Sequence, residues 1–79
     1  MSNDSLYKLP NGNYVKLSSI DGMFVRGCNY SIDLERHLYF IVEIHANKFH
    51  EQVKLSDRKT AQAFADELSK LVNEVLANN

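Results

Sequence analysis

Cysteine and net charge are both scarce in this sequence, and each shortage excludes a class of protein. Cys28 is the single cysteine in 79 residues, so neither an internal disulfide nor a cysteine-based zinc site can form. Nine Lys and Arg residues against ten Asp and Glu residues leave a net charge of -1. This balance disfavours a nucleic-acid binder that relies on bulk positive charge, and equally an acidic mimic of DNA.

Long apolar runs and glycine-rich loops are also missing. No run approaches the ~20 apolar residues of a membrane span, and residues 1–5 lack the basic and apolar regions of a signal peptide. The three glycines are scattered, so no phosphate-binding loop is predicted. We therefore expect one soluble, cytoplasmic domain over residues 1–79, with no membrane contact and no cofactor.

No spacing in the sequence indicates a catalytic site. Cys28 follows Gly27 in an apolar segment, where a free cysteine usually acts as a small buried hydrophobe. Asp33 and Glu35 lie in a polar stretch, where we expect both carboxylates to be solvated. A chain of 79 residues also leaves little room for a ligand pocket of several hundred Å³. We expect that the protein is not an enzyme.

The C-terminal residues carry the pattern of an amphipathic helix. Gaps of three or one between apolar residues keep them on a single helical stripe. These residues are Ala61, Phe64, Ala65, Leu68, Leu71, Val72, Val75 and Leu76. Ser56 or Asp57 supplies an N-cap oxygen. The pattern predicts a helix at about residues 57–77.

A strand hairpin precedes this helix. Apolar residues alternate with others over residues 38–46 and again over residues 49–55. If Asn47 and Lys48 form a two-residue turn, Val42 faces Val53, and Ile44 opposite Glu51 is the single mismatch among the inward pairs. A slip of one residue would undo this register.

The first 37 residues are less regular. Pro10-Asn11-Gly12 and Asp21-Gly22 are turn signals, which predict short strands at about residues 6–9, 13–19 and 23–28. Gly27 inside the third strand indicates a bulge or a close backbone approach. Residues 29–37 are polar and are predicted to form a surface loop.

Strands followed by one helix predict an α+β fold. We expect an antiparallel β-sheet of four or five strands at about residues 6–56, with the C-terminal amphipathic α-helix packed on one face. The predicted core consists of Phe40, Val42, Ile44, Val53, Phe64, Leu68, Leu71 and Val75. Nothing in the chain is predicted to cover the other face of the sheet.

That free face is the predicted interaction site. It carries Tyr39, Ile41, Glu43, His45, His50, Gln52 and Lys54. A partly apolar patch with a polar rim suits a protein interface, so we expect a protein-interaction module, a small regulator or inhibitor of the kind that phages and mobile elements encode against host systems. We also expect the protein to pair with a second copy in a twofold homodimer, and a partner to add a strand at an edge of the sheet. Residues 29–37 are the second choice of site.

A single-stranded nucleic-acid-binding sheet is the first alternative. Aromatic residues on a sheet can stack bases while basic residues follow phosphates. The candidates are Tyr7, Tyr14, Tyr30 and Tyr39 with Lys8, Lys16, Arg26 and Lys54. The order of elements, and the segment 14–17 before a glycine-containing turn, resemble the transcriptional-coactivator and Whirly type of single-strand DNA-binding domain. The resemblance implies a curved binding sheet and a helix that helps to form a dimer, but this chain lacks net positive charge and matches no specific motif.

Metal binding through His45 and His50 is the second alternative. In the predicted register the two imidazoles face each other, with Glu43 and Gln52 as the next pair. Two imidazoles and a carboxylate form part of a metal site, but a zinc site needs a fourth ligand. His37 lies ~25 Å along the strand from His45 at ~3.3 Å per residue and cannot join. The simpler interpretation is two solvent-facing hairpin residues with a modest pH response near neutrality, and we assign no metal ligand.

Overall fold

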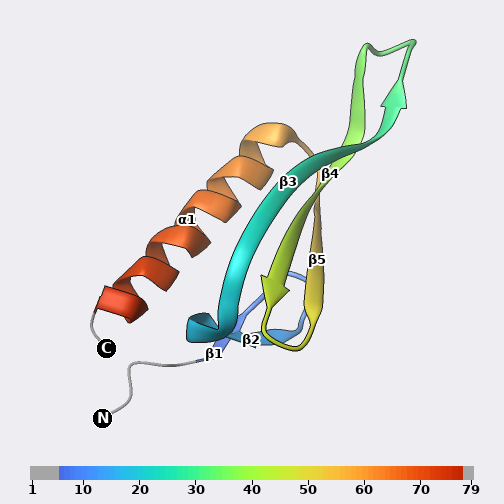
Figure 1. The fold of residues 1–79 in the computed structure, drawn as a ribbon. Helices are drawn as coiled ribbons and strands as arrows, with labels where there is room; N and C mark the ends of the chain where they lie inside the picture. Colours follow the sequence, from blue (N-terminus) through green and yellow to red (C-terminus); the bar gives the residue numbers. More distant parts are fainter. Residues whose placement is uncertain (1–5, 78–79) are drawn as a thin grey trace.

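The structure, a computed structural model, describes residues 6–77 and shows an α+β fold (Figure 1). Five strands and one short 3-10 helix precede one long α-helix. In chain order the elements are β1 (Leu6–Lys8), β2 (Tyr14–Lys16), the 3-10 helix η1 (Leu17–Ser19), β3 (Ile20–Ser31), β4 (Arg36–Ala46), β5 (His50–Leu55) and α1 (Arg58–Ala77). The helix α1 is not apolar enough to cross a membrane.

The hairpin of β4 and β5 has the predicted register. Val42 lies opposite Val53, and His45 lies opposite His50. The Ala46 N–H donates to the Phe49 carbonyl at 3.0 Å and closes the turn. The matching of apolar pairs therefore identified this register correctly.

The prediction of one sheet with four or five strands is wrong, because the five strands form two sheets. Among residues 6–77, β1 and β2 pair only with each other, whereas β3, β4 and β5 form an antiparallel sheet in that order. The predicted strand over residues 13–19 ends early, since the chain enters η1 directly after β2. The predicted turn before it is confirmed: the Gly12 N–H donates to the Leu9 carbonyl at 2.9 Å, and Gly12 has a φ of 93° that suits glycine.

Two other predictions in the first half are corrected by the β3–β4 hairpin. Asp21 and Gly22 do not form a turn, because β3 runs through them with only a local register shift. Residues 29–37 are not a surface loop, since β3 and β4 continue and leave only residues 32–35 as the turn. Asn29 adopts a φ of 52° and Glu35 a φ of 54°. Both values are left-handed conformations, which Asn tolerates better than most residues. Asn29 lies within β3, and Glu35 is the last residue of the turn before β4.

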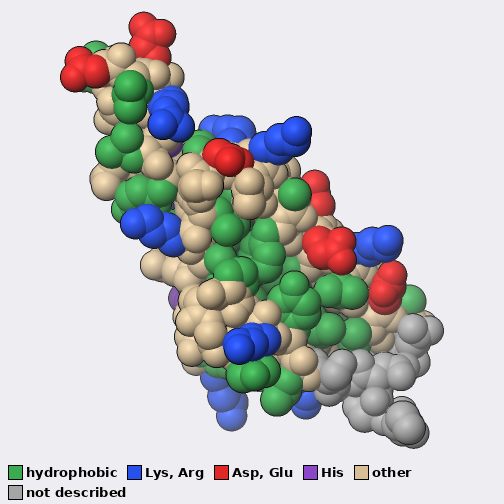
Figure 2. Space-filling model, turned by 180° about the vertical axis from the view of Figure 1, so that it is seen from behind, with side chains coloured by type: hydrophobic (Ala, Val, Ile, Leu, Met, Phe, Trp, Pro, Cys, Tyr) green, Lys and Arg blue, Asp and Glu red, His purple; other side chains and the backbone are tan. Residues whose placement is uncertain are grey.

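The far end of this hairpin, residues 29–38, is here called the arm, and it extends beyond α1 and β5 (Figure 1). Its turn exposes 84% of Ile32 and 56% of Leu34. Figure 2 shows hydrophobic side chains along the arm, at the upper left, with acidic ones at its tip. Leu38 was predicted to lie on the apolar face of β4, but it is 49% exposed because it belongs to the arm.

The core lies between α1 and one face of the three-stranded sheet. Six of the eight predicted core residues are buried: Phe40, Val42, Ile44, Val53, Leu68 and Val75. Phe64 and Leu71 are only partly buried at the margin of this core. The N-cap is Asp57, whose Oδ1 accepts the Thr60 N–H at 2.7 Å. This backbone hydrogen bond lowers the pKa of the Asp57 carboxyl because it favours the ionised form.

The β1–β2 hairpin packs on the same side of the sheet as α1. Leu9 and Val15 are each 1% exposed and belong to the core that α1 covers. Glu51, opposite Ile44 in the ladder, accepts from the Asn11 side-chain amide at 3.1 Å and from that of Asn13 at 2.8 Å. The mismatch between Ile44 and Glu51 is therefore resolved by two asparagines of the β1–β2 hairpin.

Candidate functional site

The opposite side of the three-stranded sheet, here called the open face, is covered by no other element in residues 6–77. α1 and the β1–β2 hairpin both pack on the other side. The seven predicted site residues alternate along β4 and β5 with the buried residues, so they share the open face. Four of them are half-buried and three are exposed: Tyr39, Ile41, Glu43 and His45, then His50, Gln52 and Lys54.

β3 adds three residues to the open face that sequence reasoning did not place there. Phe24 pairs with Glu43, Arg26 with Ile41, and Cys28 with Tyr39. Phe24 is 60% exposed. Cys28 is buried, as predicted for a small hydrophobe. The alternation of these residues with Met23 and Val25 indicates that they share one face of their strand. The sequence pattern did not predict which strand pairs with residues 23–28, so it could not assign that face to the open face.

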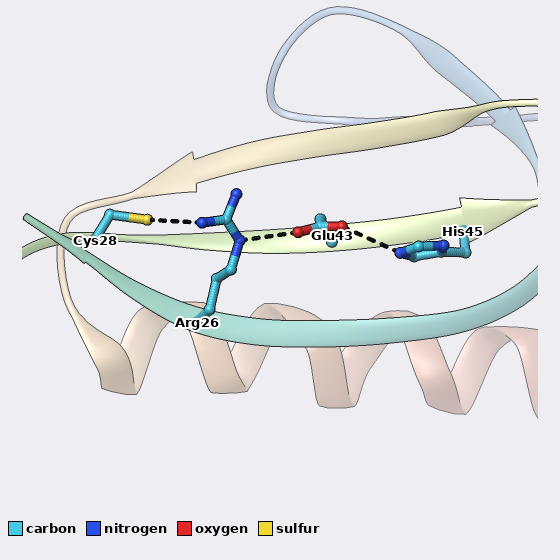
Figure 3. A network of polar contacts seen from close by, with 4 residues as sticks. All are labelled: Arg26, Cys28, Glu43 and His45. Atoms are coloured by element: carbon cyan, nitrogen blue, oxygen red, sulfur yellow. Dashed lines mark hydrogen bonds and ion pairs between the residues drawn. The ribbon is translucent and has the colours of Figure 1, made fainter.

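A chain of polar contacts crosses the open face (Figure 3). Arg26 Nε donates to Glu43 Oε2 at 2.9 Å. Glu43 Oε1 lies 3.2 Å from His45 Nε2. Arg26 Nη1 also lies 3.6 Å from Cys28 Sγ. The contacts join side chains of β3 and β4, so Glu43 is held from two sides.

The Arg26 hydrogen bond, followed by that of His45, lowers the pKa of the Glu43 carboxyl from its ordinary value of 4.5. A carboxyl with a lowered pKa in the folded state stabilises the fold above its ordinary pKa and loses this contribution as the pH falls through the lowered value. We expect Glu43→Gln to reduce the loss of stability that occurs as the pH falls below 4.5, measured by urea unfolding at each pH.

Glu67→Gln is the control for this prediction, because it removes an exposed carboxylate from α1. Its stability should follow the wild-type dependence on pH. If the free energy of unfolding depends on pH in the same way for the wild type and for Glu43→Gln, the assigned role of the Arg26–Glu43 pair is contradicted.

Rings gather at the end of the open face near the β4–β5 turn. The His45 and His50 ring centroids are 4.1 Å apart. The Phe24 ring meets His45 edge to face, with a centroid distance of 5.1 Å. Further along, the Lys54 ammonium lies 4.4 Å from the Tyr39 ring centroid. Aromatic rings and charged groups therefore contact one another on this surface, and aromatic residues are enriched in protein interfaces.

The geometry adds no support for the metal alternative. Within residues 6–77 no three His, Cys, Asp or Glu side chains are placed to hold a metal ion together. The Nε2 atom of His45 already contacts Glu43. His37 lies elsewhere, at the base of the arm, where its ring contacts those of Tyr30 and Phe40.

The hollows described on the surface lie away from the open face. One, of about 470 Å³, separates the base of the arm from the start of α1 and is lined by residues such as His37 and Arg58. Another, of about 330 Å³, lies between β3 and the second half of α1, beside Met23 and Leu76. Both hollows are open at the surface.

No family model, curated protein or solved structure matches this chain. The functional conclusion therefore depends on the residues and the geometry of the open face.

Proposed function

We propose that this chain is a non-enzymatic interaction protein that binds another protein through its open face. One observation carries the proposal: both α1 and the β1–β2 hairpin pack on the same side of the sheet. The other side keeps a half-buried Ile41 and Tyr39, an exposed Phe24 and a border of charged residues. An apolar centre with a polar rim is the composition of a recognition surface.

The finer proposal is a small cytoplasmic regulator or inhibitor that acts by occupying a surface of its target. Its size and the lack of a catalytic spacing support this class, which includes proteins encoded by phages and mobile elements against host systems. The arm extends the available surface, since Ile32 and Leu34 are exposed at its turn.

Substitution of Ile41 tests the proposal directly. With the full chain as bait, Ile41→Asp should weaken capture of the partner at least tenfold, because the new carboxylate would be desolvated at the centre of the interface. The helical circular-dichroism signal should not change. Leu76→Asp is the matched control, because Leu76 is 55% exposed on α1, away from the open face. It should bind like the wild type.

The reverse result, in which Leu76→Asp loses capture and Ile41→Asp keeps it, would contradict the proposal. If Ile41→Asp unfolds, Lys54→Glu provides the same test at an exposed position on the open face. Titration with a mixed single-stranded oligonucleotide at low salt distinguishes the nucleic-acid alternative. Binding that falls steeply as salt rises would favour that alternative, since phosphate contacts release counterions.

A further inference from the structure

β3 forms an unpaired edge of the three-stranded sheet. It is 12 residues long and stands at the end of the order β3-β4-β5, so one side pairs with β4 and no strand in residues 6–77 pairs with the other. A free edge presents N–H and C=O groups that can pair with another strand.

The two edge strands of this sheet, β3 and β5, differ in how well they are protected against pairing with another strand. β5 has only six residues, and the Asn11 side-chain amide donates to the Gln52 carbonyl at 3.2 Å. Proteins usually protect a free edge with lysine, proline or bulges. β3 contains neither lysine nor proline. Its register shift lies at its start, between Ile20 and Gly22, and its left-handed residue, Asn29, lies near its end.

The side chains of β3 are also incompletely covered. Met23 and Val25 pair with Ile44 and Val42, so they lie on the side of the sheet that α1 covers. Ile44 and Val42 are both 0% exposed, whereas Met23 and Val25 are only partly buried against the core. Phe24, between them on the open face, is 60% exposed. Apolar surface is therefore left on both sides of the edge.

We propose that β3 pairs edge to edge, antiparallel, with β3 of a second copy of this chain, about a twofold axis beside Phe24. Met23 of each copy then meets Val25 of the other, and the two Phe24 side chains lie next to each other. Arg26 faces Gly22 of the second copy, so no like charges are opposed. A second copy is the occupant that these observations favour, because in this register β3 is complementary to itself: apolar residues meet apolar residues, and Arg26 meets a glycine.

This pairing has a consequence for the open face. A twofold axis perpendicular to the sheet keeps both α1 helices on one side and joins the two open faces on the other. The result is one six-stranded face. The inference concerns the edge of the sheet and goes beyond the proposed function, because it does not depend on what binds to that face.

The experiment compares the solution mass of full-length variants by light scattering on a sizing column. The wild type should have twice the 9.1 kDa mass of the chain. Val25→Lys should halve this mass, because it places a charge in the pairing edge, while its long side chain can still reach solvent in the monomer. Leu55→Lys is the matched control, since Leu55 is likewise partly buried but lies on β5, the other edge. It should stay dimeric.

Several outcomes would overturn the inference: a monomeric wild type, a folded Val25→Lys that remains dimeric, or a folded Leu55→Lys that becomes monomeric. If Val25→Lys does not fold, amide hydrogen exchange of the wild type decides. Protection of β3 that rises with protein concentration supports the pairing, and unchanged protection overturns it. Ile41→Asp should keep the dimer, so failure of the partner-binding proposal is distinguishable from failure of this one.

Discussion

Leu68→Ala should lower the free energy of unfolding by about 2–5 kcal/mol, the usual cost of truncating a buried leucine. Leu68 is 0% exposed in α1 and shares the core with Val42, Ile44 and Val53. A domain of this size has a total stability of roughly 4–12 kcal/mol, so this change removes a large part of it. Urea unfolding followed by circular dichroism measures the loss.

Leu76→Ala is the control on the same helix. Leu76 is 55% exposed, and surface substitutions usually change stability by less than about 0.5 kcal/mol. Equal losses for Leu68→Ala and Leu76→Ala would mean that α1 does not pack on the sheet through the face described above.

Gly27→Ala should have the second-largest effect on stability, a loss of roughly 1–3 kcal/mol, the usual cost of inserting a methyl group into filled space. A Cβ atom at residue 27 would overlap the ring of His37, with Cγ as its nearest atom. This ring cannot move easily, because it packs against Tyr30 at 5.1 Å and Phe40 at 5.5 Å between ring centroids. Urea unfolding is again the measurement.

Gly22→Ala is the matched control in the same strand. Apart from its two chain neighbours, no atom of residues 6–77 lies within 4 Å of a Cβ atom at residue 22, so the substitution should be neutral or should stabilise by about 0.4–1 kcal/mol through the unfolded chain. In a Gly27→Ala, His37→Ala double variant, the loss should be smaller than the sum of the two single losses, because both changes act on one contact. Equal effects at residues 22 and 27 would contradict the close approach.

The parts of the fold that follow from local pattern were predicted correctly. The hairpin of β4 and β5 has the expected register because a slip of one residue would turn its apolar side chains to the wrong face. The helix lies within two residues of the expected range because its apolar stripe and the Asp57 cap mark it. Gly27 was expected to mark a bulge or a close backbone approach, and in the structure it is the side chain of His37 that lies close to it.

The arm and the separate β1–β2 sheet could not be predicted from local pattern. Residues 29–37 are polar, but residues 29–31 remain in β3 and residues 36–37 in β4, because the two strands pair with each other up to Ser31 and Arg36. β2 ends after three residues because Leu17 turns into the core through η1. Both outcomes depend on contacts with distant residues.

For the candidate site, alternation along β4 and β5 was sufficient to place the seven predicted residues on one face. It did not identify Phe24 and Arg26, since their position depends on the pairing of β3 with β4, in which Phe24 lies opposite Glu43 and Arg26 opposite Ile41. The contact of Arg26 with Glu43 exists only because of that pairing. A pattern within one strand determines which side chains share a face, but not which strand lies next to it.

The sequence by itself determined the α+β class, one hairpin register, the amphipathic helix and the two faces of β4, because each depends on residues close together in the chain. The tertiary structure decided that β1 and β2 leave the main sheet, that they join α1 on one side, and that β3 stands at a free edge. These features depend on which apolar surfaces bury one another across the whole chain. That competition is global, so no local period in the sequence encodes it.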